Sequence, residues 1–215
     1  MASASPSRSN QPPTASRFQA LCEQVRRCFV CPAMNHVHIL GDVNGPLDAD
    51  VLFVAEAPGR LGAARTGIPM TSDVTGRRFH AFLADAGLTR DRVFITNSVL
   101  CNPLADNGRN RRPTARDVAT CRDFLAAQLE LVRAPVVVAL GGVALETLRR
   151  IEPHEAVLAR DTGRAIAWPA ADVDGRILVA LYHPSIQSTL TRPPEAQRRD
   201  WRRLGKLVRG IVRSS

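Results

Sequence analysis

Short apolar runs recur along the chain and alternate with segments of helical length. Four of them cover residues 51–55, 93–96, 136–140 and 177–182, and the first reads Val-Leu-Phe-Val-Ala without a polar interruption. Runs of this kind are typical of parallel strands that are buried on both faces. Because strands and helical segments alternate, the pattern predicts an α/β fold, a three-layer α/β/α sandwich around a central four-stranded parallel sheet.

The other segments extend this prediction. Apolar residues at helical spacing predict helices over residues 17–27, 77–86, 114–132 and 194–212. Residues 151–176 have no clear period, and we expect a linking loop there that holds at most a short helix or an edge hairpin. Residues 1–16 are rich in Ser, Pro and Ala and predict a disordered arm, so that a single domain spans residues 17–215.

A polar residue or a glycine follows each of the four predicted strands. Glu56, Asn97 and His183 follow three of them, and Gly141 follows the fourth. Right-handed crossovers bring the carboxyl ends of parallel strands to one edge of the sheet, where open α/β sheets bind their ligands. Glu56 alone reads equally well as a solvated loop residue. A carboxylate, an amide, a glycine turn and an imidazole at one edge, however, indicate an active site.

The loop after Glu56 is long and flexible in composition. Residues 59–76 are rich in Gly and small polar side chains, and the segment is too long for a simple strand-to-helix turn. Loops of this kind often carry function. Asp73 either caps the helix that follows or takes part in the chemistry, and the sequence does not choose between the two.

The composition favours a nucleic-acid partner. The chain of 215 residues has 29 Lys and Arg against 20 Asp and Glu, a formal net charge of +9, and nearly all of the basic residues are Arg. Such surfaces favour phosphate groups, although a merely basic soluble protein has a similar composition. Arg109, Arg111 and Arg112 lie in a loop over residues 102–116, which we expect to contact phosphate rather than to be a solvated charge run.

The sequence contains no membrane signal. No segment reaches the roughly 18 apolar residues of a membrane-spanning helix, and the N-terminus lacks the apolar core of a signal peptide. We therefore expect a cytoplasmic protein, associated with the nucleoid if the source is bacterial. We also expect it to be a monomer. Disulfides are rare in that compartment, so the five cysteines need another explanation.

Four of the cysteines are candidate metal ligands. Cys28 and Cys31 form a Cys-x-x-Cys pair before a proline, a spacing found in zinc half-sites, redox pairs and iron–sulfur half-sites. A redox pair is expected at a strand-to-helix turn, whereas this pair precedes the first strand. Cys101 and Cys121 supply two further ligands, and Cys22 suits the apolar face of its helix. Four thiolates fit zinc or a 4Fe–4S cluster, the spacing does not choose between them, and scattered buried cysteines are the alternative.

Taken together, these motifs resemble the iron–sulfur uracil-DNA glycosylases. The resemblance rests on Ala-Glu-Ala-Pro-Gly at 55–59, Asn97, His-Pro-Ser at 183–185 and the cysteines, and it covers nearly all of residues 21–210. It implies the sandwich fold, a 4Fe–4S cluster held by the four cysteines, and DNA containing uracil or another deaminated base as the partner. The implied activity is that of a DNA glycosylase that flips out uracil and excises it by hydrolysis, which initiates base excision repair.

The motifs mix two subfamilies. Glu56 and Asn97 resemble family 4, although Ala55 stands where that family has Gly. The loop through Asp73 and the segment 186–189 resemble family 5, in which an Asp at the place of Asp73 is thought to act in catalysis.

Two departures bear on the substrate and the product. Met70 stands where both families usually place a Phe that stacks on the flipped base, so a glycosylase that prefers hypoxanthine or xanthine is an alternative. A non-catalytic binder of uracil-containing or damaged DNA is the alternative from another class. The loop with Arg111 and Arg112 lacks the His of the covalently trapping relatives, and we expect no covalent trapping.

The resemblance also implies roles for single residues. Glu56 or Asp73 would position the water and stabilise the sugar cation, and His183 would donate a hydrogen bond to O2 of the leaving base. The amide of Asn97 would read O4 and N3–H of uracil, a pattern that cytosine reverses. Ile186 or Leu190 would wedge into the base stack. Further base-pocket residues would be Ala57, Gly59, Met70 and Ser185, and further DNA contacts would come from Arg65, Arg109, Arg111, Arg112 and Arg192.

Overall fold

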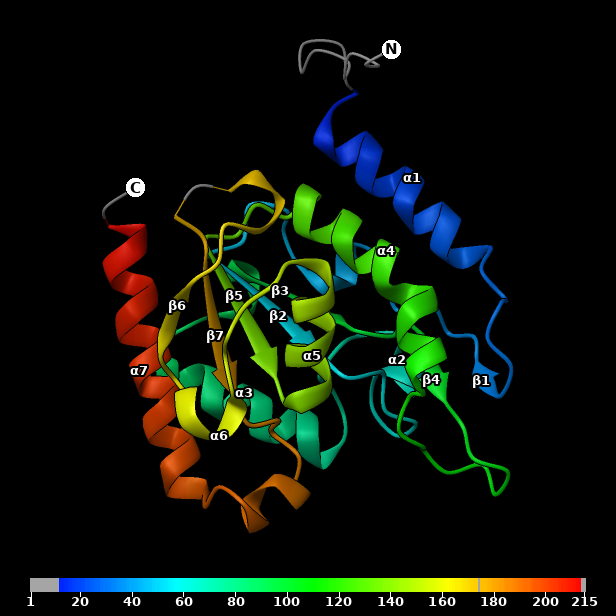
Figure 1. Cartoon of the computed structure of the whole chain (residues 1–215). Coiled ribbons are helices and arrows are strands. Elements are labelled where there is room, and N and C mark those ends of the chain that lie inside the picture. Colours follow the sequence, from blue (N-terminus) through cyan, green and yellow to red (C-terminus); the bar gives the residue numbers. More distant parts are fainter. Residues whose placement is uncertain (1–11, 174, 214–215) are drawn as a thin grey trace.

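A mostly parallel sheet forms the centre of the protein, as a computed structural model that describes residues 12–173 and 175–213 shows (Figure 1). The sheet has five strands in the order β3-β2-β5-β7-β6. Four strands run parallel to one another: β2 (Val51–Ala55), β3 (Val93–Asn97), β5 (Val136–Leu140) and β7 (Ile177–Leu181). The predicted parallel sheet is therefore confirmed, because these are the four apolar runs of the sequence.

The fifth strand confirms the edge hairpin that was one expectation for residues 151–176, although its bounds were not predicted. β6 (Ala165–Ala167) pairs antiparallel with β7 at the edge of the sheet, within the segment expected to be a linking loop. That segment also contains two short helices, α6 (Leu158–Asp161) and η4 (Ala170–Asp172). A strand of three residues has too few positions to show an alternating pattern, so only its pairing with β7 reveals it.

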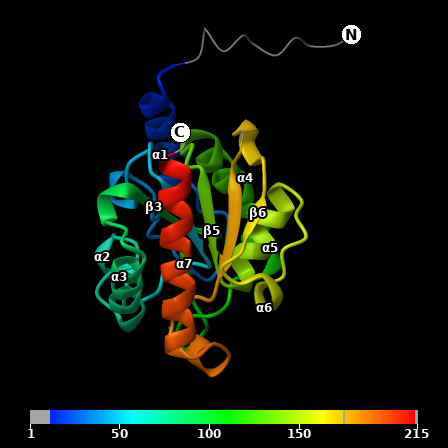
Figure 2. The same cartoon turned by 90° about the vertical axis from the view of Figure 1, so that its left-hand side faces the viewer.

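Helices cover both faces of the sheet, which confirms the three-layer sandwich. In Figure 2 the sheet is seen nearly edge-on, with α3 on one side and α5 on the other. One apolar core joins a face of the sheet to α1 (Thr14–Arg26), α4 (Ala115–Leu131) and α5 (Gly142–Ile151). The other core joins the opposite face to α3 (Val74–Ala86) and α7 (Pro194–Val212).

Trp201 is the centre of the second core. Its ring is fully buried and stacks on that of Phe53, with centroids 5.4 Å apart. One turn further along α7, Gly205 lies so close to α3 that a Cβ atom there would overlap the carbonyl oxygen of Ala86. The absence of a side chain at Gly205 thus sets the distance between α3 and α7, and α3 carries one wall of the candidate site.

Element ends differ from the sequence prediction at two helices. α1 begins at Thr14, so residues 14–16, assigned to the disordered arm, form its first turn, and Arg17 N–H donates to the carbonyl of Pro13. Residues 1–11 of that arm lie outside the described residues. α3 begins at Val74 rather than at residue 77, because Asp73 caps it.

Short elements complete the fold. A two-stranded antiparallel sheet pairs β1 (Met34–Asn35) with β4 (Asn102–Pro103). The remaining short helices are η2 (Asp42–Asn44), α2 (Ala63–Thr66), η3 (Arg90–Arg92) and η5 (Gln187–Leu190). Among the described residues, no helix combines the length and the apolar character that a membrane crossing requires.

Candidate active site

One cavity of about 650 Å³ opens at the carboxyl ends of the four parallel strands. It is lined by the four strand-end residues that the sequence singled out, Glu56, Asn97, Gly141 and His183. The structure therefore brings together groups that are up to 127 positions apart in the chain (183 − 56 = 127). The other pocket residues named from the sequence also line it: Ala57, Gly59, Met70, Asp73 and Ser185.

Glu56 is held firmly at the end of β2. The carbonyls on either side of this junction accept backbone hydrogen bonds, that of Ala55 from Ser98 at 2.8 Å and that of Glu56 from Val99 at 3.1 Å. Burial raises the pKa of the Glu56 carboxyl, and the nearby positive charge of Arg112 opposes this shift. The carboxylate thus lies in a poorly solvated place with a cation close by, a setting common among catalytic carboxylates.

Asp73 both caps a helix and faces the cavity. Its Oδ1 atom accepts a hydrogen bond from Gly76 N–H at 2.8 Å, at the first turn of α3. Its Oδ2 atom lies against Gly62, where an added Cβ would come within 2.6 Å of this oxygen. Capping is thus one role of Asp73, and the second oxygen is placed where it lines the cavity.

His183 faces the cavity as a neutral ring. Burial lowers the pKa of its imidazole to about 4, and the negative charge of Asp73 opposes the shift only in part. Its Nδ1 atom accepts a hydrogen bond from Ser185 N–H at 3.2 Å, which leaves the ring proton on Nε2. The hydroxyl of Ser188 donates to the carbonyl of His183 at 2.6 Å and holds the turn in place.

The loop between Glu56 and α3 has an unusual backbone. Met70 and Ser72 have φ values of +54° and +64°, in the left-handed region that residues other than Gly seldom adopt. The hydroxyls of Thr66 and Thr71 lie 2.9 Å apart and close the loop on itself. As a result Met70 is half-buried, packs against the core between the sheet and α3, and lines the cavity.

A second groove of about 780 Å³ adjoins the cavity and is strongly basic. Both share Asp73 in their linings, and Ile186 lies in the groove. The sequence pointed to Arg65 and Arg109 but missed Arg60 and Arg77, although Arg60 directly follows the Ala-Glu-Ala-Pro-Gly motif. Within residues 12–173 and 175–213, no carboxylate forms an ion pair with the four arginines of the groove, Arg60, Arg65, Arg77 and Arg109.

Two arginines assigned to DNA contacts are engaged inside the protein. Arg111 forms an ion pair with the buried Asp117 at 2.7 Å and donates to the carbonyl of Leu104. Arg192 donates two hydrogen bonds to the buried Asp200, at 2.9 and 2.7 Å. These contacts do not support a phosphate role for Arg111 and Arg192, because their guanidinium groups already stabilise buried carboxylates.

The remaining residues of the DNA-contact prediction lie at the surface. Arg112 is exposed, close enough to Glu56 for its charge to act on the carboxyl. Ile186 is 55% exposed and Leu190 is 91% exposed, both beside the His-Pro-Ser turn. A leucine that is almost fully exposed gains little from the fold, which fits a contact with apolar surface on a ligand.

The four predicted ligand cysteines lie near one another. Cys101 and Cys121 are buried, and Cys28 and Cys31 are half-buried. Burial, together with negative charge on the neighbouring cysteines, raises the pKa of Cys101 to about 11 and that of Cys121 to about 12. Cys22 lies on the buried face of α1 and belongs to the apolar core. Four thiolates that repel one another in a buried place fit a site for a positively charged metal group.

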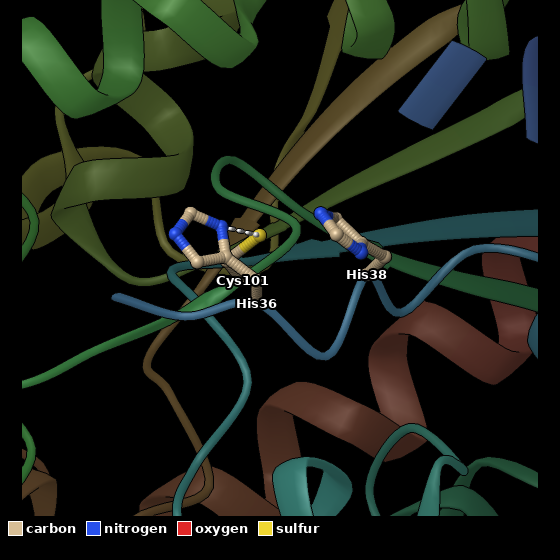
Figure 3. A group of neighbouring side chains, drawn as sticks. All are labelled: His36, His38 and Cys101. Atoms are coloured by element: carbon tan, nitrogen blue, oxygen red, sulfur yellow. Dashed lines mark hydrogen bonds between the residues drawn. The ribbon is translucent and has the colours of Figure 1, made fainter. Parts of the chain in front are cut away.

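Two histidines that the sequence analysis did not single out, His36 and His38, lie beside Cys101 at the cysteine site. Figure 3 shows the Nδ1 atom of His36 pointing at the sulfur of Cys101, 3.9 Å away, with His38 beside them. The three ligand atoms of His36, His38 and Cys101 lie within 4.8 Å of one another. The exposed ring of Phe29 packs against both imidazoles, at 5.0 and 5.2 Å between centroids. The His-x-His spacing between the two cysteine pairs was the available signal.

Comparison with known proteins agrees with this geometry. Residues 43–205 match the family model of the uracil DNA glycosylase superfamily. The type-4 uracil-DNA glycosylase of Thermotoga maritima is 31% identical over 169 residues, which are 78% of this chain and 81% of that protein. That of Archaeoglobus fulgidus is 33% identical over 162 residues, 74% of this chain and 77% of that protein. The type-5 uracil-DNA glycosylase of Pyrobaculum aerophilum is 32% identical over 154 residues, 66% of this chain and 63% of that protein.

Proposed function

Because the chain belongs to the uracil-DNA glycosylase superfamily, we propose that it excises uracil from DNA by hydrolysing the bond between the base and deoxyribose. The observation that carries the proposal is the convergence of Glu56, Asn97 and His183 on one cavity. The cavity volume of about 650 Å³ is within the range of small-molecule sites and accommodates a single base with its sugar. A base inside a duplex reaches such a site only by flipping out of the stack.

Asn97 recognises the base in this proposal. It is the last residue of β3, is only 5% exposed, and lines the cavity. Its amide would donate to O4 and accept from N3–H of uracil, whereas cytosine presents the opposite groups. The rigid end of a strand is a suitable place for a base-recognising side chain, because a displaced amide would discriminate less well between uracil and cytosine.

His183 stabilises the leaving base. Uracil leaves with negative charge that develops on O2, and the Nε2–H of a neutral imidazole donates a hydrogen bond to it. The low pKa of about 4 supports this role, because the ring remains in one protonation state across the neutral range. Gly141 and Gly142, at the start of α5, line the same cavity, and a helix N-terminus also favours negative charge.

A carboxylate positions the attacking water and stabilises the cationic sugar. Glu56 has this role, since it lies on the rigid end of β2 and is poorly solvated. The Oδ2 atom of Asp73 assists from the other side of the Gly-rich loop, while its Oδ1 atom remains bound to α3. The two carboxylates therefore have unequal shares in the reaction.

DNA lies across the basic groove beside the cavity. Arg60, Arg65, Arg77 and Arg109 bind phosphates there, and Arg112 adds charge near Glu56. Leu190 or Ile186 enters the gap that the flipped nucleotide leaves, since both are exposed at the same turn. Unstacking one base costs a few kcal/mol, and the apolar wedge offsets part of that cost.

Four thiolates hold the metal group in this proposal, and it is a 4Fe–4S cluster. Cys28, Cys31, Cys101 and Cys121 are its ligands, and Cys22 is not one of them. Such a cluster would cross-link the segment after α1 to the loop after β3 and to α4, and the positive charge of its core would offset part of the charge of the four thiolates. The reaction at the cavity needs no step at the cluster, so its contribution is structural.

Excision from oligonucleotides tests the proposal. Single- and double-stranded oligonucleotides with one uracil, hypoxanthine, xanthine, thymine or cytosine are incubated with the protein, and abasic sites are then cleaved with alkali. We expect cleavage at uracil, and a loss of it in Asn97→Ala. Preferred cleavage at hypoxanthine or xanthine would mean that Met70 widens the pocket. Binding without any cleavage would identify a damage-binding protein instead.

A further inference from the structure

Asn102 connects the cysteine site to the loop that follows Glu56. It comes directly after Cys101, and its backbone belongs to β4, paired with Asn35 of β1. Its side chain reaches the loop after Glu56, where its Nδ2 atom donates to the carbonyl of Pro58 at 2.8 Å. The residue is fully buried, so this hydrogen bond is shielded from water.

Asn110 makes a second connection from the same cysteine-bearing loop. Its Oδ1 atom accepts one hydrogen bond from Asn102 Nδ2 at 3.1 Å and one from the backbone N–H of Arg60 at 3.0 Å. Pro58 and Arg60 flank Gly59, so the two asparagines fix the backbone on both sides of that glycine. The carbonyl of Gly59 also accepts hydrogen bonds from Gly62 N–H and Ala64 N–H, both at 3.1 Å, which hold the loop from within. The two asparagines add a restraint from outside the loop, which Gly59 cannot supply because it has no side chain to pack.

We propose that Asn102 and Asn110 form a latch through which the cysteine-bearing segment positions the Glu56 carboxylate. The inference rests on the proposed glycosylase function. The start of the motif is already fixed by Ser98 and Val99, and the latch fixes its end two residues after Glu56. A misplacement of about 1 Å at a catalytic group costs roughly 10²-fold in rate, so restraint on both sides matters.

A purely structural role explains Asn102 less well. Its Oδ1 atom is buried, and within the described part of the chain it has no hydrogen-bond partner. An unsatisfied buried acceptor is unfavourable, and an apolar residue of similar size would avoid it. The amide therefore serves its donor hydrogen bonds to Pro58 and Asn110, and both residues are positioning residues rather than catalytic ones.

The latch also predicts how metal loss reaches the active site. Cys101 directly precedes Asn102 in the chain. A metal group held by Cys101 would anchor this end of the ladder between β1 and β4, and its loss would weaken the hold of Asn102 on Pro58. The loop after Glu56 would then sample more conformations, although no ligand cysteine lines the cavity.

A matched pair of variants at the exposed Asn110 tests the latch. Asn110→Asp keeps the acceptor oxygen for Asn102 and Arg60, whereas Asn110→Ala removes it. Single-turnover uracil excision should fall roughly 10–100-fold in Asn110→Ala, with little change in KM, and recover to within about threefold in Asn110→Asp. Amide hydrogen exchange of residues 58–62 should be faster in the Ala variant only. Asn107→Ala is the control, since this side chain bonds only within the same loop, to Arg109 N–H.

Other outcomes would overturn the latch. These are an unchanged rate and unchanged exchange in Asn110→Ala, or an equal loss in Asn110→Asp. Hydrogen exchange is the readout that does not need activity. If the wild-type protein excises no base at all, the proposed function fails, while exchange at residues 58–62 still decides whether the latch exists.

Discussion

The backbone N–H of Ser185 donates a hydrogen bond to Nδ1 of His183 over 3.2 Å, and this contact decides which nitrogen of the imidazole can act as a hydrogen-bond donor. A ring nitrogen that accepts a hydrogen bond carries no proton, so the neutral ring has its proton on Nε2. Burial keeps the ring neutral by lowering its pKa to about 4, although the charge of Asp73 acts in the opposite direction. The turn after β7 thus presents a neutral donor to the cavity.

This neutral histidine predicts a pH dependence of stability. Unfolded His183 takes up a proton near its ordinary pKa of 6.5, whereas the folded ring resists protonation until about pH 4. In that window the unfolded state binds more protons, so the free energy of unfolding should fall as the pH is lowered, by up to about 1.4 kcal/mol per pH unit. Urea denaturation at several pH values measures it. His183→Gln should flatten this slope between pH 6.5 and 4, and equal slopes would contradict the lowered pKa.

The two carboxylates should contribute unequally to the rate. Glu56→Gln removes the charge at the end of β2 and should lower the single-turnover rate by roughly 10²–10⁴-fold. Asp73→Asn keeps an oxygen that can cap α3, and its loss should stay below about tenfold. Because burial raises the pKa of Glu56, the wild-type rate should also fall with decreasing pH through a pKa above the ordinary 4.5. The reverse ranking would assign the water to Asp73, and equal large losses would mean that both share it.

The metal site should depend on four cysteines and not on the fifth. Purified protein should be brown, with broad visible absorption, and substitution of Cys28, Cys31, Cys101 or Cys121 by Ala should abolish the colour. Cys22→Ala is the matched control. Cys22 is packed in the core on the buried face of α1, so this substitution should leave the absorption unchanged. A colourless protein with one equivalent of zinc would exclude the iron–sulfur cluster.

The basic groove should determine the salt dependence of DNA binding. Each substitution of Arg60, Arg65, Arg77 or Arg109 by Gln should reduce the slope of log Kd against log salt by about 0.7–1, as expected for one lost phosphate contact. Arg192→Gln is the control, because this arginine pairs with the buried Asp200. That variant should lose about 1–3 kcal/mol of stability and keep the slope of the wild type. A changed slope in Arg192→Gln would mean that Arg192 does contact a DNA phosphate.

The contact between α3 and α7 should be sensitive to one methyl group. Gly205→Ala places a Cβ against the carbonyl oxygen of Ala86 and should destabilise the protein by about 1–3 kcal/mol. Gly210→Ala on the same helix meets no atom within 4 Å and should be neutral or stabilising, by up to about 1 kcal/mol. Thermal or urea denaturation of the two variants compares them directly. A stable Gly205→Ala protein would mean that α7 shifts away from α3 at little cost.

Local patterns were sufficient for the sheet and for the place of the site. The four parallel strands were visible because each is buried on both faces and therefore apolar throughout. Once the strands are parallel, right-handed crossovers leave little choice for where Glu56, Asn97 and His183 meet. The burial of Cys22 likewise followed from its position on the apolar face of a helix.

Pairings between distant short segments were not visible in the sequence. β1 and β4 have two residues each, and β6 has three, so each becomes a strand only through its partner. The two roles of Asp73, as cap and as cavity carboxylate, also needed the fold, because Gly62 makes room for its second oxygen.

The sequence by itself determined the four parallel strands, the approximate positions of four long helices and the strand-end residues, because each depends on neighbours within a few positions. Only the tertiary structure decided the partner of each charge. Arg111 and Arg192 look like the other arginines in the sequence, yet buried carboxylates hold them, while Arg60 and Arg77 line the open groove. The hydrogen bonds of Asn102 and Asn110 to Pro58 and Arg60 are likewise visible only in the tertiary structure. A hydrogen bond or ion pair depends on the approach of groups far apart in the chain, and spacing along the sequence does not encode that approach.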